Sequence, residues 1–478
     1  MSSYSIQGLK AHLPLVGDRH LPFSKSIPAD NQSQTTVIIG RNGCGKSSLL
    51  RDLVMILRSI SQTGRGRAKS TVAWSMIDRL DSVSNGVRES LRPFDKKADK
   101  SLVDSPDYSS ALPERVIALS FTPYDKFPLD RYNHSVHRPR EEEEEPFYVY
   151  LGSKAESGIA SPRQRMLDIV GKLVHGQFGL ERAASIGRTL EAIGYEPRLA
   201  IEYYPSFRLR DAWRRSRRDP FGSDQKVQVT PRAAQQLDLL RSELGENEIE
   251  MIFRSGAKLD LDIQSGLRDF SLDPRKFDFL VSHGVLVVDS IKLSRKESRD
   301  IDLMELSSGE LNIFSAFVAL AANLRDGCLV LIDEPENSLH PEWQIRYIEM
   351  LMAVLKQHEG CHYVIATHSP LIVSGASKLG SQILRLDDEQ VEISPDGIAN
   401  QSPDATLMNA FDVVTVNNSY LRQLLLEGMT LLEQGKLQTA RGEQILAFLS
   451  KQIEHVSSED PARKLIIALL KRGLGDAG

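Results

Sequence analysis

The feature that most constrains this chain is a glycine-rich segment close to its N-terminus. Residues 40–47 read Gly-Arg-Asn-Gly-Cys-Gly-Lys-Ser, which satisfies the pattern G-x-x-x-x-G-K-[ST]. A β-branched run at 35–39 precedes the segment, and leucine, valine, methionine and isoleucine recur at helical spacing over 48–60. The sequence therefore predicts a strand, a tight loop and a helix, the order that favours phosphate binding.

Each residue type in this loop has a physical use in holding phosphate. The glycines let backbone N–H groups turn inward at a helix N-terminus, where the helix dipole favours negative charge. Lys46 can bring a positive charge to the β- and γ-phosphates of ATP, and Ser47 a hydroxyl to Mg²⁺. We therefore predict an ATP and Mg²⁺ site lined by Gly40, Arg41, Asn42, Gly43, Cys44, Gly45, Lys46, Ser47 and Ser48.

A second signal is a pair of acids after an apolar run. Residues 329–332 are Leu-Val-Leu-Ile, and Asp333 and Glu334 follow directly. Buried strands rarely end in paired acids for packing reasons. We predict that Asp333 helps to hold Mg²⁺ and that Glu334 polarises the attacking water as a general base.

With these two signals in place, the sequence resembles the ABC-type ATPases, which include transporter motors and the heads of chromosome and DNA-repair ATPases. Leu-Ser-Ser-Gly-Glu at 306–310 looks like the signature loop of that family. Thr-His-Ser at 367–369 looks like its switch-histidine loop, and residues 335–341 follow the paired acids in the position of its D-loop. The order of the motifs is also that of the family.

The resemblance implies an assembly. In that family two heads bind head to tail, so that the signature loop of one copy caps the ATP held by the other. Ser307 and Gly309 would then contact the γ-phosphate in trans, with Ser308 in the same nucleotide-binding set, and a homodimer or higher homo-oligomer is expected. His368 would sense the γ-phosphate. A serine hydroxyl, a glycine N–H and a helix N-terminus all suit an anion.

One element of the family pattern is missing. The family places a glutamine after the strand that follows the phosphate loop, whereas here the predicted strand 116–121 leads into Thr122, Pro123, Tyr124 and Asp125. A plain turn is the favoured interpretation. The alternatives are that Thr122 or Asp125 takes over part of the metal or water contact, or that the coupling loop works differently. The departure argues against coupling of the transporter kind.

The stretch 305–343 looks most like compact bacterial defence ATPases related to overcoming-lysogenization-defect nucleases, including the ATPase subunits of Septu, retron-linked Septu and PARIS systems. The resemblance implies a regulatory subunit of an anti-phage complex that controls an associated nuclease, of HNH type if Septu-like or Toprim type if PARIS-like. Residues 401–478 lack the clustered acids of a Toprim domain, so the nuclease is expected to be a separate protein. The alternatives are a repair or recombination ATPase that clamps duplex DNA and, least favoured, a transporter motor.

The expected fold class is α/β: an ABC-type P-loop ATPase core with an inserted helical or mixed middle region and a C-terminal helical region. We predict core segments at 1–130 and 281–400, the insertion at 131–280, and helices over 401–478. These helices either pack on the core as a bundle or dock a partner.

Residues 207–218 are rich in arginine, with basic residues from Arg208 to Arg218. A solvated helix face is at least as well supported there as DNA or RNA binding. The acidic run 141–145 is predicted to be a solvated loop.

Composition restricts the partners. Lys and Arg number 59 against 64 Asp and Glu, a net charge of -5, so no global positive field attracts nucleic acid or anionic lipid. The three cysteines, Cys44, Cys328 and Cys361, lie far apart and lack disulfide or zinc spacing. The sequence shows no signal peptide and no apolar run of membrane-spanning length. A cytoplasmic location without membrane insertion is therefore expected.

Overall fold

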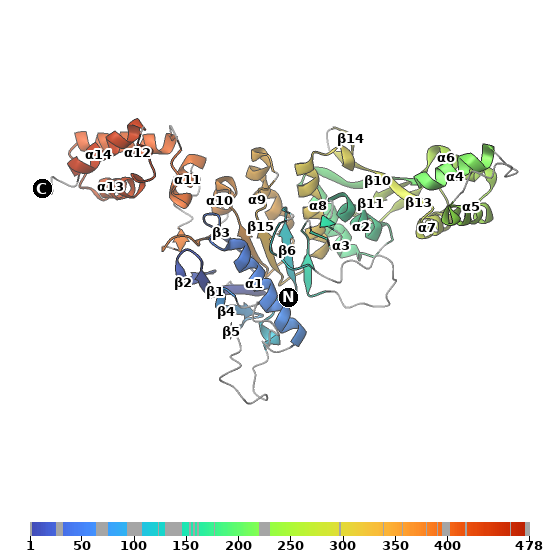
Figure 1. Cartoon of the computed structure of the whole chain (residues 1–478), viewed down its shortest axis with the longest axis horizontal. Coiled ribbons are helices and arrows are strands. Elements are labelled where there is room, and N and C mark those ends of the chain that lie inside the picture. The colour runs from blue at the N-terminus through green and yellow to red at the C-terminus, as the bar shows by residue number, and fades with distance from the viewer. Residues whose placement is uncertain are drawn as a thin grey trace, which may run out of the picture. The chain divides into compact units, whose positions relative to one another are not determined.

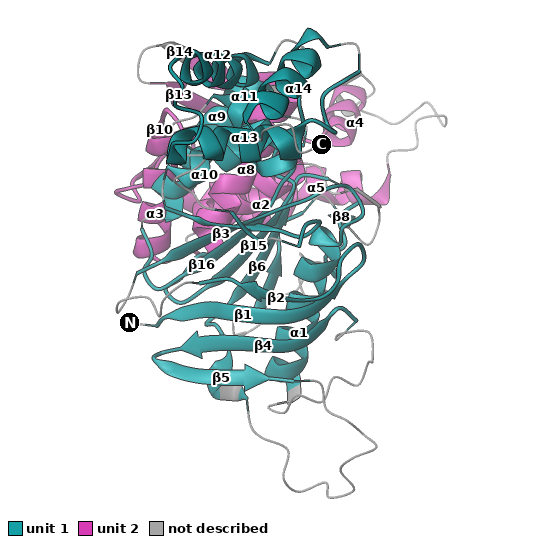
Figure 2. Ribbon diagram, turned by 90° about the vertical axis from the view of Figure 1, so that its left-hand side faces the viewer, with its two compact units in different colours: residues 1–159, 324–478 teal, residues 160–323 magenta. Residues whose placement is uncertain are grey.

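The computed structural model describes residues 2–24, 32–63, 75–92, 108–122, 124–129, 146–152, 154–155, 158–159, 162–175, 177–218, 230–295, 298–337, 339–355, 357–378, 380–389, 391–393, 402–415, 418–458 and 460–473. The chain divides into two compact units, one of residues 1–159 and 324–478 and the other of residues 160–323, coloured teal and magenta in Figure 2.

The first unit contains a seven-stranded sheet, ordered β18-β17-β3-β16-β15-β6-β7 (Figure 1). All neighbours pair in parallel except β17 with β18. Its strands are β3 (Gln34–Ile39), β6 (Val116–Ser120), β7 (Tyr148–Tyr150), β15 (Leu329–Asp333), β16 (His362–Ala366), β17 (Gln382–Arg385) and β18 (Glu392–Ile393). Every residue of β6, β15 and β16 is buried, which explains their apolar sequences.

A four-stranded antiparallel sheet, ordered β2-β1-β4-β5, accompanies the parallel one. It consists of β1 (Tyr4–Leu13), β2 (Gly17–Pro22), β4 (Ile77–Ser84) and β5 (Val87–Leu91). Helix α1 (Lys46–Thr63) contributes Leu49, Leu53 and Leu57 to a core shared with both sheets. The unit also contains η1 (Ser109–Ala111), β8 (Lys154–Ala155), β9 (Gly158–Ile159), α9 (Pro341–Leu355) and α10 (Pro370–Ser377).

The C-terminal part of this unit is helical, as predicted. Its helices are α11 (Pro403–Phe411), α12 (Ser419–Glu433), α13 (Ala440–Gln452) and α14 (Pro461–Gly473). They bury a cluster of their own, which includes Met408, Leu424, Leu449 and Ile466. Helix α11 packs against α10, which begins directly after the predicted switch-histidine loop. The C-terminal helices are therefore joined to an element that starts beside the candidate site.

The second unit is built on a five-stranded antiparallel sheet, ordered β12-β11-β10-β13-β14. Its strands are β10 (Tyr195–Pro205), β11 (Ala257–Asp262), β12 (Arg268–Phe270), β13 (Leu286–Arg295) and β14 (Ser298–Asp302). Its helices are α2 (Pro162–Val174), α3 (Leu180–Ala192), α4 (Phe207–Arg218), α5 (Pro231–Glu243), α6 (Glu246–Ser255), α7 (Pro274–Ser282), η2 (Leu303–Glu305) and α8 (Ser308–Asn323). Helices α2 and α3 pack on α8, so the helix that follows the predicted signature loop groups with the middle region.

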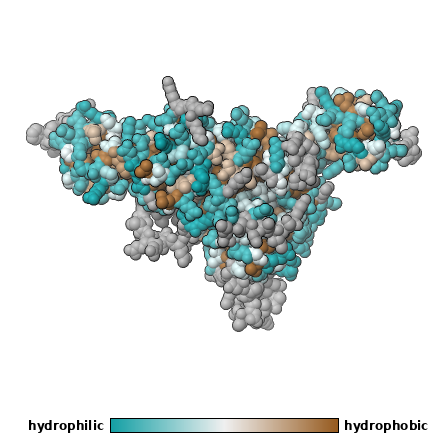
Figure 3. All heavy atoms as spheres, turned by 180° about the vertical axis from the view of Figure 1, so that it is seen from behind, coloured by the Kyte–Doolittle hydropathy of each residue, from teal (hydrophilic) through white to brown (hydrophobic). Residues whose placement is uncertain are grey.

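The predicted fold class is confirmed: an α/β chain with a parallel-sheet core, a loop of the phosphate-binding type between β3 and α1, an inserted mixed region and a helical C-terminus. Among the residues that the structure describes, no helix combines the length and the apolar character that crossing a membrane requires. The face in Figure 3 is mainly hydrophilic, with apolar residues in scattered patches. All three cysteines are buried and unpaired.

Candidate functional site

The first unit brings most of the predicted site residues together at one end of its parallel sheet. The glycine-rich loop follows β3, Asp333 ends β15, and His368 comes two residues after β16. Strand β16 lies between β3 and β15, with Ala366 opposite both Ile38 and Asp333. The carboxyl ends of these parallel strands therefore meet, which is where open α/β sheets bind their ligands.

The glycine-rich loop needs its glycines. Gly40, Gly43 and Gly45 have φ of 147°, 82° and 106°, a region that residues with a side chain rarely adopt. A Cβ on Gly40 would lie 2.8 Å from Cys44 Sγ, and one on Gly45 would lie 2.7 Å from Met76 Cε. The loop therefore has both a backbone reason and a packing reason for glycine at two of these positions.

Lys46 is buried at the centre of the site, with 5% of its surface exposed. Its Nζ donates to the Gly40 carbonyl at 2.8 Å and lies 2.7 Å from His368 Nε2. Burial lowers the pKa of Lys46. An ammonium group held inside a loop of backbone N–H groups is a suitable partner for phosphate oxygens.

His368 stands between Lys46 and Glu334. Its Nε2 lies 3.2 Å from Glu334 Oε1 as well as 2.7 Å from the Lys46 ammonium. One ring nitrogen can donate to the carboxylate or accept from the ammonium, but it cannot do both at once. A phosphate that accepted from Lys46 would remove this competition and leave His368 free to donate.

Glu334 has the properties of a general base. The hydrogen bond from His368 lowers the pKa of Glu334 more than burial raises it, so the carboxylate is ionised at neutral pH. Asn337 Nδ2 donates to its other oxygen at 2.9 Å. Glu334 also has φ of 47°, a strained left-handed backbone that costs about 1–3 kcal/mol and is concentrated at functional sites.

Asp333 and Ser47 fit a divalent cation. Ser47 Oγ donates to Asp333 Oδ1 at 3.1 Å. Burial, together with the negative charges of Glu334 and Asp125, raises the pKa of Asp333 to about 7 against the opposing effect of the Ser47 hydrogen bond. Within the described residues, no group of three or more His, Cys, Asp or Glu could hold a metal ion. Mg²⁺ commonly uses one or two carboxylates plus substrate phosphates and water, so this oxygen pair suits it.

The other residues of the predicted nucleotide set have defined places. Ser48 Oγ accepts from Lys126 Nζ at 2.7 Å, Cys44 is fully buried, and Asn42 is exposed. Arg41 lies 3.4 Å from Asp387, measured from Nε to Oδ2. Two backbone N–H groups of the loop already have acceptors: that of Arg41 donates to Asp387 Oδ2 at 3.1 Å, and that of Cys44 donates to the Arg41 carbonyl at 3.2 Å.

Glu336 is a site residue that the sequence reasoning did not single out. Its Oε1 accepts from the backbone N–H of His368, and its Oε2 is buried without a partner in the described part of the chain. Burial raises the pKa of Glu336. The only signal in the sequence was its place in the predicted D-loop, two residues after the predicted general base, Glu334. Ser338 of that loop lies outside the described residues.

The turn after β6 is occupied by structural contacts. Asp125 accepts from Tyr150 Oη at 2.6 Å and pairs with Lys154 Nζ at 2.9 Å. Thr122 Oγ1 accepts from the Tyr124 N–H. These contacts favour the plain-turn interpretation, because the Asp125 carboxylate is already committed to Tyr150 and Lys154.

The predicted signature residues lie in the second unit, at the N-terminus of α8. Ser307 donates from both N and Oγ to Glu310 Oε2, at 3.0 and 2.8 Å, and its Oγ accepts from the Glu310 N–H. This reciprocal pattern is a capping box. Ser307 and Ser308 are exposed, and the first N–H groups of a helix have no intrahelical acceptor. The segment therefore presents donors to solvent.

The arginine-rich segment forms α4. Leu209 and Ala212 are buried, and Trp213 stacks on Phe253 at 4.4 Å between ring centroids. Arg208 and Arg214 are exposed, whereas the side chains of residues 216–218 are not described. One face of α4 is therefore packed and the other solvated. The acidic run 141–145 also lies outside the described residues.

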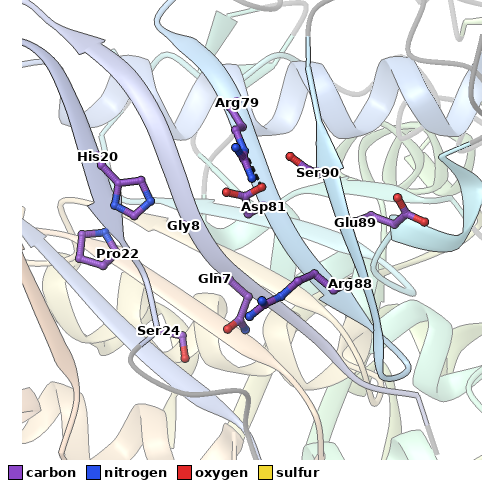
Figure 4. Close-up of a pocket in the computed structure, with 10 residues that line it drawn as sticks. All are labelled: Gln7, Gly8, His20, Pro22, Ser24, Arg79, Asp81, Arg88, Glu89 and Ser90. Carbon is purple, nitrogen blue, oxygen red and sulfur yellow. Dashed lines mark hydrogen bonds and ion pairs between the residues drawn. The ribbon is translucent and has the colours of Figure 1, made fainter.

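A cavity of about 550 Å³ lies on the antiparallel sheet, away from the phosphate-loop residues. Figure 4 shows its polar lining, in which Arg79 pairs with Asp81 at 2.8 Å. Its lining residues come from β1, β2, β4, β5 and the residue Ser24, and none belongs to the glycine-rich loop. We assign it no part in the candidate site.

Residues 157–374 match the family described as "AAA domain, putative AbiEii toxin, Type IV TA system". This segment contains Ser307, Asp333, Glu334 and His368 but not the glycine-rich loop. No curated protein matches the chain.

Two solved structures share a low similarity with the chain. One is an SMC head bound to the C-terminal winged-helix domain of ScpA, at 11% identity and a TM-score of 0.28, covering 80% of this chain and 94% of that one. The other is the ADP conformation of an ATP-binding cassette of an ABC transporter, at 12% identity and a TM-score of 0.26, covering 80% of this chain and 87% of that one.

Proposed function

We propose that this protein binds and hydrolyses ATP with Mg²⁺, and that it is the regulatory subunit of an anti-phage defence complex whose associated nuclease is of HNH type. The observation that carries the ATPase part is the cluster at the ends of β3, β15 and β16. His368 Nε2 lies 2.7 Å from Lys46 Nζ and 3.2 Å from Glu334 Oε1, and Ser47 Oγ lies 3.1 Å from Asp333 Oδ1. The ATPase-domain family match over 157–374 supports the same assignment.

Each residue has a chemical role in this proposal. The loop N–H groups and Lys46 bind and orient the triphosphate. Ser47 and Asp333 would hold Mg²⁺, which screens phosphate charge when bound. Glu334 accepts a proton from the attacking water, because its carboxylate is ionised and fixed by Asn337. His368 donates to the γ-phosphate, and Glu336 holds the backbone of His368 in place.

The proposal includes a second copy. Ser307, Ser308 and Gly309 are exposed or half-exposed at the start of a 16-residue helix, a suitable surface for the γ-phosphate of a neighbouring copy. Closed dimers would contact nucleotide from two sides and open ones from one, so ATP occupancy would shift the assembly and restrain or release the nuclease. A Toprim nuclease is the alternative partner.

The test is Glu334→Gln, with the exposed Glu349→Gln on α9 as the matched control. We expect Glu334→Gln to lower the ATP turnover rate by about 10²–10⁴-fold while nucleotide stays bound. Mass measurement should show two copies per particle with ATP. Turnover equal to that of the parent would show that Glu334 is not the base. Co-purification with the product of the neighbouring gene tests the defence role separately, and a permease in that place would contradict it.

A repair or recombination ATPase that clamps duplex DNA is the second candidate. The exposed Arg208 and Arg214 on α4 favour it, because such residues can neutralise phosphates. ATP turnover that rises on addition of duplex DNA would support this candidate over control of a nuclease.

A further inference from the structure

A second cluster of buried charges lies beside the glycine-rich loop. Asp387 follows β17, whose Arg385 is in register with Ile39 of β3, so residue 387 comes next to the start of the loop. The Asp387 side chain is 3% exposed. Its Oδ2 accepts from the Arg41 backbone N–H at 3.1 Å, and its Oδ1 would lie 3.2 Å from a Cβ on Gly40. Asp387 therefore fixes the first peptide units of the loop.

Arg385 continues this chain of contacts away from the loop. Its Nε donates to Asp387 Oδ1 at 3.0 Å, and its Nη1 donates to Asp412 Oδ2. The guanidinium is 5% exposed and Asp412 is 7% exposed, so water screens neither contact effectively. Burial alone would lower the pKa of Arg385, but hydrogen bonds and charges from Asp387 and Asp412 raise it. One buried cation therefore joins the carboxylates of Asp387 and Asp412.

Asp412 belongs to the C-terminal helices. It ends α11 in the left-handed conformation, and its Oδ1 accepts from Gln452 Nε2 of α13 at 3.0 Å. Lys451 Nζ lies 3.7 Å from the same oxygen. The contacts thus run without interruption from Arg41 through Asp387, Arg385 and Asp412 to Gln452.

The charges of this path nearly cancel. Arg41, Arg385 and Lys451 face Asp387, Asp388 and Asp412, so three cations stand against three carboxylates. Arg385, Asp387 and Asp412 are the buried members of this set, whereas the Arg41 and Lys451 side chains are 66% and 55% exposed. Removing one of the three buried partners leaves a buried charge uncompensated, and the remaining groups must rearrange. A change at one end therefore has a physical route to the other.

We propose that Asp387 is a positioning residue for the glycine-rich loop and that Arg385 couples it to the C-terminal helices, so that the state of these helices sets the nucleotide affinity of the loop. The nucleotide part of this inference rests on the proposed function. Coupling of this kind is reciprocal, so ATP would change the stability of α11–α13 by the same factor. A protein that binds the C-terminal helices would then change the affinity of the loop for nucleotide, and bound nucleotide would change the affinity of the helices for that protein.

The experiment uses three variants of the full chain: Asp412→Asn, Asp387→Asn and, as the matched control, Asp404→Asn. Asp404 also lies on α11 and accepts hydrogen bonds from Ser419, but it does not touch the path. Hydrogen exchange at the backbone amides of 40–46 is measured without nucleotide, and ATP affinity is measured separately. We expect Asp412→Asn to speed exchange in the loop and weaken ATP binding about fivefold, Asp387→Asn to do so about tenfold, and Asp404→Asn to do neither.

The double variant distinguishes coupling from general loosening. If Arg385 carries the effect, Asp412→Asn should add nothing to loop exchange once Asp387 is Asn. Full additivity, equal effects of Asp404→Asn and Asp412→Asn, or unchanged loop exchange in Asp387→Asn would each overturn the proposal. If Asp412→Asn unfolds α12–α14, the same hydrogen-exchange measurement is made on Arg385→Met, which removes the contact from the β17 side. If the parent protein does not bind ATP but the Asp387→Asn and Asp412→Asn substitutions still change hydrogen exchange in the loop, the proposed function is wrong and the coupling remains supported.

Discussion

Replacing Asp333 by Asn should stabilise the protein while abolishing its activity. The Asp333 side chain is 2% exposed, and its pKa is raised from 3.8 to about 7, chiefly by burial. Between pH ~4 and ~7 the folded protein therefore binds more protons than the unfolded chain. The free energy of unfolding falls as pH rises through this window, and the penalty is complete above pH ~7.

The size of the penalty follows from the two pKa values. A difference of about 3 between 7 and 3.8, at about 1.36 kcal/mol for each pH unit, gives about 4 kcal/mol at pH 8. Asparagine has the same shape and no charge, and its Oδ1 can still accept from Ser47. We expect the melting temperature of the metal-free protein to rise by about 5–10 °C at pH 8, and by little at pH 4.

Scanning calorimetry at pH 4, 6 and 8, without nucleotide or Mg²⁺, measures this difference. Asp78→Asn is the control, since Asp78 is an exposed carboxylate on β4 of the same unit, and it should change nothing. ATP turnover should be lost in Asp333→Asn even though the protein is more stable. A stability gain of equal size at pH 4 and pH 8, or a loss at pH 8, would refute the reasoning.

Three further predictions concern the loop and α4. Lys46→Ala should abolish ATP binding in a fluorescence titration, because the site loses its buried ammonium; undiminished affinity would contradict the assignment. Gly45→Ala should weaken ATP binding more than Gly43→Ala, since both have positive φ but only the new Cβ at 45 meets a neighbour, Met76; equal affinities would show that the clash is relieved. If α4 binds nucleic acid, Arg208→Ala with Arg214→Ala should weaken binding to duplex DNA and reduce its salt dependence; unchanged salt-sensitive binding would exclude α4.

Much of the candidate site could be predicted from the sequence because its residues follow short, characteristic patterns. The glycine-rich loop stands between a β-branched run and an apolar helix, and the acids at 333 and 334 end an apolar strand. Parallel strands bring such ends to one edge whatever their separation along the chain. The sequence assigned Lys46, Asp333 and His368 to one nucleotide site through these motifs and the family resemblance, and the pairing of β16 with β3 and β15 accounts for their proximity.

The residues that sequence reasoning missed act through tertiary contacts. Glu336 matters because it reaches the backbone of His368, and Asp387 because β17 pairs with β3. Neither residue belongs to a sequence motif that identifies the residue it contacts. The boundaries of the middle region were equally hard to predict. Helix α8 follows a motif that the sequence analysis assigned to the ATPase core, but it packs on α2 and α3 and belongs to the second unit. The domain ranges proposed from sequence stay predictions.

The separation of the site residues along the chain has a consequence during synthesis. Ser47 meets Asp333 across 286 residues, and Lys46 meets His368 across 322. At about 5–20 residues per second, a ribosome needs roughly 15–60 s to deliver the second half after the first. Throughout that interval β3 lacks both of its sheet neighbours, since β16 and β17 come later. The nascent chain therefore exposes the apolar strand β3 until β16 and β17 have been made, and we expect chaperone availability to affect the yield of folded protein.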